Sequence, residues 1–408
     1  MNRQAEISKS IASILPDEVN LVSLTQLASL WSNYGHIYRL KLSRSSDNDS
    51  CYPESIILKS IHPPPLSPGS NPSESHRRKL LSYDVEEYFY RNLSSFLSPS
   101  KCKVAKCYSN IVTDERSSNG NNLLLEDLSV VYPFEANGSL GKEGTEAVLT
   151  WLASFHGTYF LIQHHQTVKG QKIILPLIPA PLLVDKNALN RAEGLWKRGT
   201  YWYLETRREE MADIDANEHD WLLPWIEKVD DAIEKEIEKY GTLLHGDVKG
   251  ANIVFNRPPY PHRQNRTKHT KSHSKSSTTQ DDPLRCALYD FQYVGLGLPV
   301  HDLVYFLGTS IESSLLKSPS SEMELLKFYH AAFLEGINET HVTVAKGPGE
   351  IVYPFEVLLK HWDLAIVDWY RFMAGWGFWG NDVWVTRRAK DIVRKWEKEP
   401  DKSLDVLK

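Results

Sequence analysis

The sequence is poor in the features that mark secreted, membrane-spanning and nucleic-acid-binding proteins. Its 408 residues include only four cysteines, and none of them has Cys-x-x-Cys spacing. Thiols this sparse cannot build a disulfide scaffold and are typical of a reducing compartment, so we expect a cytoplasmic protein. The net charge is only −5. This charge creates no global field that favours nucleic acid or an anionic membrane surface.

Long apolar runs are also missing. No stretch reaches the roughly 18 apolar residues that a membrane span needs. The first residues, Met-Asn-Arg-Gln-Ala-Glu, lack the apolar core of a signal peptide. We therefore expect neither a membrane nor a nucleic-acid partner, and the sequence indicates no oligomeric state. Hydrophobic residues still make up 41% of the chain, enough for one large two-lobed domain or two ordinary ones.

A polar segment between two tight apolar runs is the most informative stretch. Residues 243–256 read Leu-Leu-His-Gly-Asp-Val-Lys-Gly-Ala-Asn-Ile-Val-Phe-Asn. Such flanks are typical of a buried scaffold that presents polar side chains to a cleft. Asp247 can take the proton of an attacking hydroxyl, Lys249 can offset charge on a transferring group, and Asn252 can offer an oxygen to Mg²⁺. These residue types indicate phosphoryl transfer.

A second stretch supplies another carboxylate. Residues 287–292, Ala-Leu-Tyr-Asp-Phe-Gln, end a short apolar run in Asp290. Asp290 could hold the metal ion that bridges nucleotide phosphates. The two stretches together predict a metal-dependent phosphotransferase.

The two motifs resemble those of the aminoglycoside phosphotransferase and choline kinase group, which has the protein-kinase-like fold. The resemblance rests on His-Gly-Asp-x-x-x-x-Asn, the apolar strand that follows it, and Asp-Phe. The branch that matches best is the ecdysteroid-kinase-like (CHK) branch, because of Asp-Phe-Gln and the later His-Asp-Leu at 301–303. The resemblance implies an α+β, bilobal fold with a small antiparallel β-sheet lobe, residues 1–127, and a large mainly α-helical lobe, residues 128–408. It also implies ATP and Mg²⁺ as cofactors and a small molecule with a hydroxyl group as acceptor.

The nucleotide-binding lysine is expected in the small lobe. Residues 35–42 and 55–59 alternate like strands. Lys59 ends the second of these strands, and the resemblance makes it the lysine that binds the nucleotide phosphates. Only Gly35 is available for a flexible loop over the phosphates. Residues 1–31 carry scattered apolar positions and are expected to form a lead-in helix.

A helix predicted over residues 77–97 should supply the partner of Lys59. The resemblance selects Glu86, which lies three residues before Phe-Tyr. Glu87 is the alternative, because one residue turns a helical side chain by about a quarter turn.

The strand predicted over residues 122–128 stops in acidic residues. The resemblance places the hinge that meets the adenine edge here, with the backbone groups of Glu126, Asp127 and Leu128 facing the base. An ordinary strand end is the alternative interpretation.

The rest of the chain is expected to be mainly helical. Asp302 is expected to cap a helix and so to support the catalytic loop, His156 is expected to be a packed core histidine, and most of the twelve tryptophans are expected to be core. Residues 257–283 are rich in Lys, Arg, His, Ser and Thr and nearly free of apolar side chains, which predicts a disordered insert between two strands. The expected helices cover residues 144–160, parts of 186–240, 302–316, 322–337, 355–374 and 385–397.

Two alternatives compete with a small-molecule kinase. A protein kinase is disfavoured because Gly246 stands where an arginine would read a phosphorylated activation loop, and only eleven residues separate Asp290 from Asp302. A non-catalytic nucleotide-binding scaffold is disfavoured because the lysine, the base and both metal ligands are present. Nothing in the sequence identifies the acceptor.

Overall fold

The structure is a computed structural model that describes residues 19–44, 53–64, 71–108, 121–165, 167–168, 171–172, 174–181, 193–260, 282–338 and 353–398. Two sequence-based predictions fall partly outside these ranges. They are residues 1–18 of the expected lead-in helix and residues 261–281 of the expected disordered insert.

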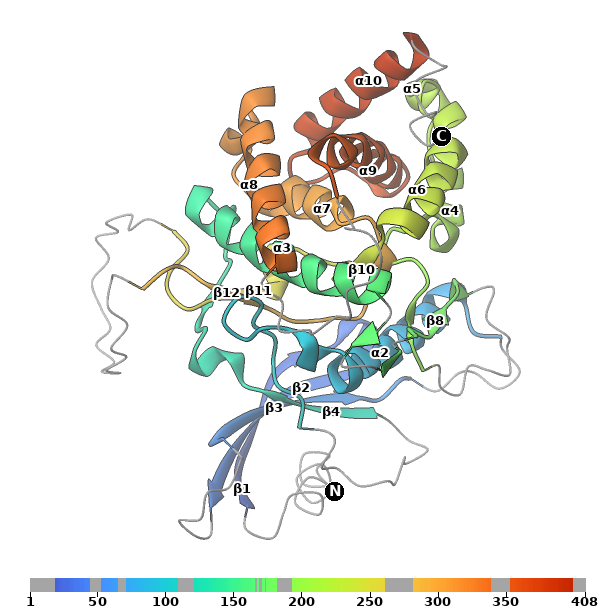
Figure 1. Ribbon diagram of the computed structural model, residues 1–408. Coiled ribbons are helices and arrows are strands. Elements are labelled where there is room, and N and C mark those ends of the chain that lie inside the picture. Colours follow the sequence, from blue (N-terminus) through green and yellow to red (C-terminus); the bar gives the residue numbers. More distant parts are fainter. Residues whose placement is uncertain are drawn as a thin grey trace, which may run out of the picture.

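An antiparallel sheet of four strands forms one end of the molecule (Figure 1). Side chains alternate between its two faces. Leu40, Ile56 and Leu58 share a small core on one face, so Lys59 points from the opposite face. The strands lie side by side in chain order: β1 (Val19–Ser29), β2 (Gly35–Arg44), β3 (Ser55–Ile61) and β4 (Asn121–Glu126).

Strand β1 corrects the prediction of a helix over residues 1–31. It is an edge strand that pairs with β2, and most of its side chains are exposed or only partly buried. An edge strand with so little burial needs no regular apolar alternation, so its sequence carries no clear two-residue period. The pairing with β2 is a tertiary contact that residues 1–31 alone do not reveal.

The helix α2 (Glu74–Asn92) lies between the sheet and the helical part of the molecule (Figure 1). It begins three residues before the predicted start, where the Ser73 hydroxyl accepts a hydrogen bond from the His76 N–H. It ends five residues before the predicted end. Leu81, Val85 and Phe89 are buried on one side of the helix and anchor it in the main core.

The larger part of the molecule is mainly helical. The helix α3 (Lys142–His165) packs against α8 (Pro319–Asn338). The buried helix α9 (Phe355–Trp376) packs against α6 (Ile226–Tyr240), α7 (Val300–Ser310) and α10 (Asp382–Lys398). The predicted α+β architecture, an antiparallel sheet lobe and a large mainly helical lobe, is confirmed. The short helices α4 (Arg208–Ala212) and α5 (Ala216–His219) precede α6.

Short strands connect the helices and flank the two predicted motifs. One sheet has the order β10-β13-β9-β8, and another has the order β12-β11-β5. The region 186–240, in which helical segments were expected, also contains strand β9, which is stabilised by parallel pairing with β8 and β13. The strands are β5 (Phe134–Glu135), β6 (Thr167–Val168), β7 (Gln171–Lys172), β8 (Leu177–Ile178), β9 (Leu195–Trp196), β10 (Thr242–Leu244), β11 (Ile253–Phe255), β12 (Cys286–Leu288) and β13 (Gly295–Gly297).

Most of the tryptophans lie in the core, as predicted. Trp151, Trp202, Trp362 and Trp369 are among the largest fully buried side chains, whereas Trp376 is largely exposed. Among the described helices, none combines the length and the apolar character that crossing a bilayer requires.

Candidate active site

The polar segment found in the sequence forms a loop between the buried strands β10 and β11. Gly246 gives this loop its turn, because its φ is +82° and an added Cβ would lie 2.2 Å from the carbonyl oxygen of Tyr293. A glycine accepts this backbone conformation without steric cost. Asp247 and Val248, which follow the turn, are buried, and the loop becomes accessible from Lys249 onward.

The loop is held by a buried carboxylate from α7. Asp302 accepts hydrogen bonds from the backbone N–H groups of His245, at 2.7 Å, and Gly246, at 2.9 Å. Its Oδ2 also lies 3.0 Å from Nε2 of the fully buried His156. The prediction that Asp302 caps a helix is wrong, since α7 begins two residues earlier with Pro299 at the cap. The expected support of the loop is observed, but it acts through long-range hydrogen bonds.

Asp247 lies in a donor-rich and largely dry position. Its Oδ2 accepts hydrogen bonds from Lys249 Nζ at 2.8 Å and from Asn252 Nδ2 at 3.1 Å. Its Oδ1 is buried and has no hydrogen-bond partner in the described part of the chain. Burial raises the pKa of Asp247 to about 6, the nearby charge of Asp290 adds to the rise, and Lys249 limits it. An unpaired oxygen with raised basicity is the property that a general base needs.

Lys59 is clamped between two carboxylates. Its Nζ lies 2.5 Å from Oε2 of Glu86 on α2 and 2.9 Å from Oδ1 of Asp290. Glu87 instead pairs with Arg91 on the outer side of the same helix, so the structure selects Glu86 over Glu87 as the partner. Burial opposes the charge of Lys59, but the two carboxylates outweigh it and raise the pKa of Lys59 above its usual range. The lysine therefore carries its charge at neutral pH.

The two carboxylates differ in their electrostatic state. Glu86 is only 2% exposed, and burial raises its pKa despite the neighbouring ammonium of Lys59. Burial also disfavours the charge of Asp290, but Lys59 and Lys249 hold its pKa below its usual value. Asp290 therefore remains a carboxylate at neutral pH, as a metal ligand must.

Asp290 has an unusual backbone and a well-defined side-chain orientation. Its φ is +69°, a left-handed conformation that is uncommon for a residue other than glycine and that clusters at functional sites. Gln292 Nε2 donates to Asp290 Oδ1 at 2.7 Å, and the Ser82 hydroxyl donates to Gln292 Oε1 at 3.0 Å. This chain connects Asp290 to α2. It leaves Oδ2 of Asp290 without a hydrogen bond among the described residues.

Phe291 anchors the second motif in the core. Its ring stacks on Phe89 of α2, with centroids 4.2 Å apart, and contacts the ring of His245 at 4.6 Å. His245 Nε2 also lies 3.1 Å from the carbonyl oxygen of Tyr289. The apolar residue of Asp-Phe-Gln thus fixes Asp290 relative to both α2 and the loop between β10 and β11.

The predicted hinge follows β4. The side chain of Glu126 pairs with Lys103, and Asp127 accepts hydrogen bonds from Arg39 and from Ser55. Burial opposes the charge of Asp127, but these hydrogen bonds hold its pKa below the usual value. Both acidic side chains are therefore occupied in local contacts. The peptide N–H of Leu128 makes no hydrogen bond within the described chain, so a backbone donor remains at the predicted position.

The oxygen atoms present fit a small, hard cation held jointly with phosphate. Asp290 Oδ2 and the Asn252 amide oxygen make no hydrogen bond among the described residues, and Mg²⁺ prefers ligands of this kind. No group of three or more His, Cys, Asp or Glu side chains in the described part could hold a metal alone. A protein site with one carboxylate and one amide needs further oxygen ligands from elsewhere, which nucleotide phosphates and water supply in kinases.

Sequence reasoning missed two residues of this site. Gln292 was part of the quoted motif but had no assigned role, and its bond to Asp290 becomes visible only in three dimensions. Burial raises the pKa of Tyr305 on α7, and the nearby carboxylate of Asp247 adds to the rise. Because Tyr305 lies in a buried helix, its sequence context is that of any core residue, and no sequence signal marked it as part of the site.

Comparison with known proteins agrees with the resemblance stated from the motifs. Residues 274–341 match the model of the ecdysteroid kinase-like family. The matched part contains Asp290 and Asp302, so the resemblance to this family is observed over these residues. No curated protein gives a significant match to the chain.

Solved structures similar to this chain include several small-molecule kinases. A choline kinase from Cryptosporidium parvum is 11% identical, with 98% of this chain and 97% of that chain covered and a TM-score of 0.48. An ethanolamine kinase from Plasmodium vivax is 11% identical, with 96% and 89% covered and a TM-score of 0.42. An amicoumacin kinase in complex with AMP-PNP, Ca²⁺ and Ami is 13% identical, with 97% and 94% covered and a TM-score of 0.41.

Proposed function

We propose that this protein is an ATP- and Mg²⁺-dependent phosphotransferase that acts on a hydroxyl group of a small-molecule acceptor. The observation that carries the proposal is the position of Lys59, which bridges Glu86 and Asp290. A buried lysine held by a helix glutamate and directed at the Asp of Asp-Phe is the arrangement that positions nucleotide phosphates in kinases.

The nucleotide side is formed by the sheet, α2 and the second motif. Bound ATP and Mg²⁺ would supply the phosphoryl group and neutralise its developing charge. Lys59 would bind the phosphates, with Glu86 fixing its direction, while Asp290 and Asn252 would hold the metal ion. The Leu128 N–H is a donor for the adenine edge, with the hinge at Glu126 to Leu128. We place the boundary between lobes 1–127 and 128–408 at this hinge.

The acceptor side is formed by the catalytic loop. Asp247 Oδ1 would accept the proton of the acceptor hydroxyl, because it is the oxygen left unpaired at the site. Lys249 and Asn252 hold the other oxygen and so fix the carboxylate plane. The Lys249 ammonium is also available to offset charge on the transferring group. A cytoplasmic location fits the free thiols of Cys102 and Cys286.

Two alternative functions remain distinguishable. A protein kinase needs an activation segment after Asp290, but here β13 and α7 follow at once, and β13 pairs with β10. This leaves no room to dock a peptide. A non-catalytic nucleotide-binding scaffold would bind nucleotide at the same site without turning it over, so a turnover assay separates it from a kinase.

The test combines nucleotide binding with turnover. We expect AMP-PNP to raise the melting temperature more with Mg²⁺ than without it, and we expect a metabolite library to contain an alcohol that stimulates ATP consumption. Asp247→Ala should abolish turnover and leave nucleotide binding nearly unchanged. Binding without turnover on any alcohol would support the scaffold, and absence of nucleotide binding would refute the proposal.

A further inference from the structure

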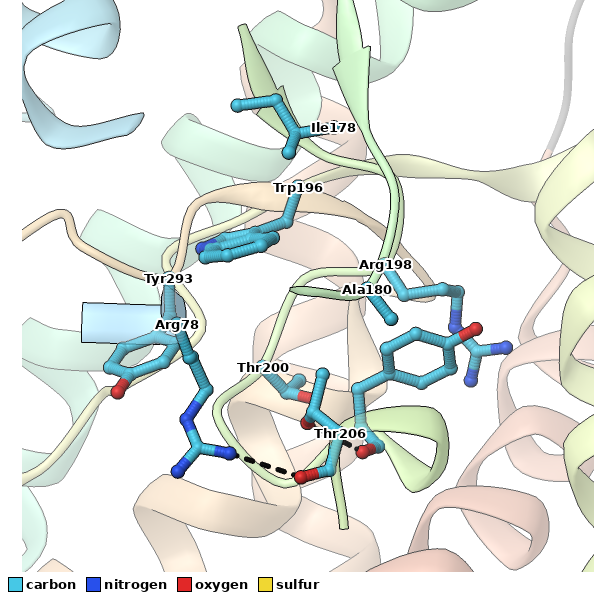
Figure 2. A pocket seen from close by; sticks show the side chains of 9 residues that line it. Arg78, Ile178, Ala180, Trp196, Arg198, Thr200, Thr206 and Tyr293 are labelled. Carbon is cyan, nitrogen blue, oxygen red and sulfur yellow. Dashed lines mark hydrogen bonds between the residues drawn. The ribbon is translucent and has the colours of Figure 1, made fainter. Parts of the chain in front are cut away.

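Gln292, the last residue of the Asp-Phe-Gln motif, is fixed at three points. Its amide nitrogen donates to Oδ1 of Asp290 at 2.7 Å, and its amide oxygen accepts a hydrogen bond from the Ser82 hydroxyl at 3.0 Å. Its backbone carbonyl accepts a hydrogen bond from the indole of the buried Trp196 at 2.8 Å. Trp196 and Tyr293, the residue after Gln292, line one small hollow beside α2 (Figure 2). The backbone and both ends of the Gln292 amide are therefore held.

The chemistry of its neighbours determines which way the Gln292 amide points. A carboxylate can only accept hydrogen bonds, so Asp290 must meet the NH₂ group and leave the amide oxygen to Ser82. The Ser82 hydroxyl has one hydrogen, which the carbonyl oxygen of Lys79 also attracts at 2.8 Å. Since this hydrogen is shared, the bond from Ser82 is the weaker of the two that the amide makes. The bond to Asp290 is assisted by the charge of the carboxylate.

Gln292 supports a metal ligand and is not itself one in this arrangement. Its amide oxygen, the one side-chain atom of Gln that can bind a metal, faces Ser82 of α2. Its amide nitrogen occupies Oδ1 of Asp290, so that Oδ2 is the oxygen without a donor in the described part of the chain. A hydrogen-bond donor held on one oxygen of a metal-binding carboxylate fixes its orientation and tunes the affinity for the metal.

Two routes from one face of α2 end on the same oxygen atom. Ser82 and Glu86 are four residues apart, so they lie one turn above the other on the helix. Glu86 holds Lys59 Nζ at 2.5 Å, and Lys59 donates to Asp290 Oδ1 at 2.9 Å. Ser82 holds Gln292, which donates to the same Oδ1. Ser82 is 0% exposed and Glu86 is 2% exposed, so bulk water does not replace either contact.

The two routes differ in their response to a bound nucleotide. Phosphate oxygens attract the ammonium of Lys59 as a carboxylate does, so they compete with Asp290 for it. The Gln292 amide is neutral, and Ser82 holds it on the other side. It is therefore the donor that stays on Oδ1 when Lys59 is shared with phosphates.

We propose that Gln292 is a positioning residue that sets the metal affinity of Asp290 and makes this affinity depend on the position of α2. The inference rests on the proposed function, because it takes Asp290 as a ligand of the metal that accompanies the nucleotide. Gln292 keeps Oδ1 occupied and leaves Oδ2 for the metal, and Ser82 keeps Gln292 in place. A displacement of α2 separates Ser82 from Gln292, so it weakens the metal site together with the clamp on Lys59.

The test measures metal affinity without turnover. The melting temperature of the whole protein is followed as Mg²⁺ is added at a saturating concentration of AMP-PNP, and the midpoint of the increase gives the apparent affinity for the metal. Gln292→Leu removes both amide contacts at similar side-chain volume. We expect this variant to raise the Mg²⁺ midpoint by at least about tenfold, as losing a residue that orients a metal ligand does. AMP-PNP binding without Mg²⁺, measured by calorimetry, should stay unchanged.

Variants of Ser82 test whether α2 acts through Gln292. Ser82→Ala should raise the Mg²⁺ midpoint by about fivefold, the size of one neutral hydrogen bond. Ser82→Ala combined with Gln292→Leu should be no worse than Gln292→Leu alone, because Ser82 acts through the amide that is then missing. Thr158→Val is the matched control. It removes a buried hydroxyl of α3 that donates to the Ser154 carbonyl of its own helix at 2.8 Å, and it should leave the midpoint unchanged.

Four results would overturn the proposal. One is a wild-type Mg²⁺ midpoint in a folded Gln292→Leu. Another is an equal loss of AMP-PNP binding with and without Mg²⁺, which would mean that Gln292 only maintains the fold. The others are additive effects of the Ser82 and Gln292 substitutions, and a wild-type protein whose melting temperature does not respond to Mg²⁺. If Gln292→Leu does not fold, Ser82→Ala decides, and an unchanged midpoint in that variant overturns the proposal.

The proposed function depends on different measurements. It is refuted if the wild-type protein does not bind AMP-PNP, and it is supported if an alcohol is phosphorylated, whatever the variants of Ser82 and Gln292 do. A kinase with unchanged Mg²⁺ midpoints in both variants would keep the proposed function and lose the role of Gln292.

Discussion

Replacing Asp247 by Asn should make the protein inactive and more stable at the same time. Asp247 is 5% exposed, and burial raises the pKa of its carboxyl from 3.8 to about 6. A rise of about two pH units, at about 1.4 kcal/mol for each, corresponds to about 3 kcal/mol of destabilisation when the carboxylate is charged. Asn keeps the shape of the side chain and removes the charge. Lys249 loses its partner, but its side chain is 38% exposed and water can solvate it.

The sign of the pH dependence follows from the raised pKa. Below about pH 4 the carboxyl is protonated in both the folded and the unfolded chain, so Asp and Asn should give similar stability. As the pH rises through about 6, the folded wild-type protein must carry a buried charge that the unfolded chain carries in water. The advantage of Asp247→Asn should therefore grow from near zero at pH 4 to as much as about 3 kcal/mol at pH 8.

The assay is a series of thermal and urea melts of both proteins between pH 4 and pH 8. Asp391→Asn is the control, since this side chain is 55% exposed and lies on the outer face of α10. If the wild-type protein has the proposed activity, its kcat/KM should fall as the pH drops through about 6, and Asp247→Asn should lose about 10²–10⁴-fold in turnover. The reasoning about a buried base would be refuted if Asp247→Asn were less stable than wild type at pH 8. It would also be refuted if the difference in stability between the two proteins were the same at every pH.

Three further substitutions test the rest of the site. Glu86→Gln should weaken nucleotide binding and lower the free energy of unfolding by about 1–3 kcal/mol, because Lys59 loses a buried partner. Glu87→Gln should change the free energy of unfolding by less than about 0.5 kcal/mol. Equal effects of the two variants in a binding titration and a melt would contradict the pairing of Lys59 with Glu86. Asp290→Asn should remove the extra melting-temperature increase that Mg²⁺ gives to AMP-PNP, and an unchanged Mg²⁺ effect would exclude it as a ligand. Gly246→Ala should cost at least about 1–3 kcal/mol in denaturant melts, since its Cβ meets backbone at φ +82°, and a neutral result would show that the turn can relax.

Local patterns sufficed to predict which segments the structure brings together at the site. His-Gly-Asp-x-x-x-x-Asn and Asp-Phe-Gln each lie within a few residues, and apolar strands flank both. The antiparallel pairing of β11 with β12 then follows, and it brings Asn252 and Asp290 to the same end of one hairpin. The choice between Glu86 and Glu87 was different. Both are helical and acidic, and only the packing of α2 against the sheet decides which one faces Lys59.

Features that depend on distant partners could not be predicted. Asp302 was interpreted as a cap because an acid near a helix start usually serves the nearest N–H groups. It serves instead the N–H groups of His245 and Gly246, more than fifty residues away in the chain. Strand β1 was missed for a related reason. It is stabilised by pairing with β2 rather than by burial, so its own residues show little pattern.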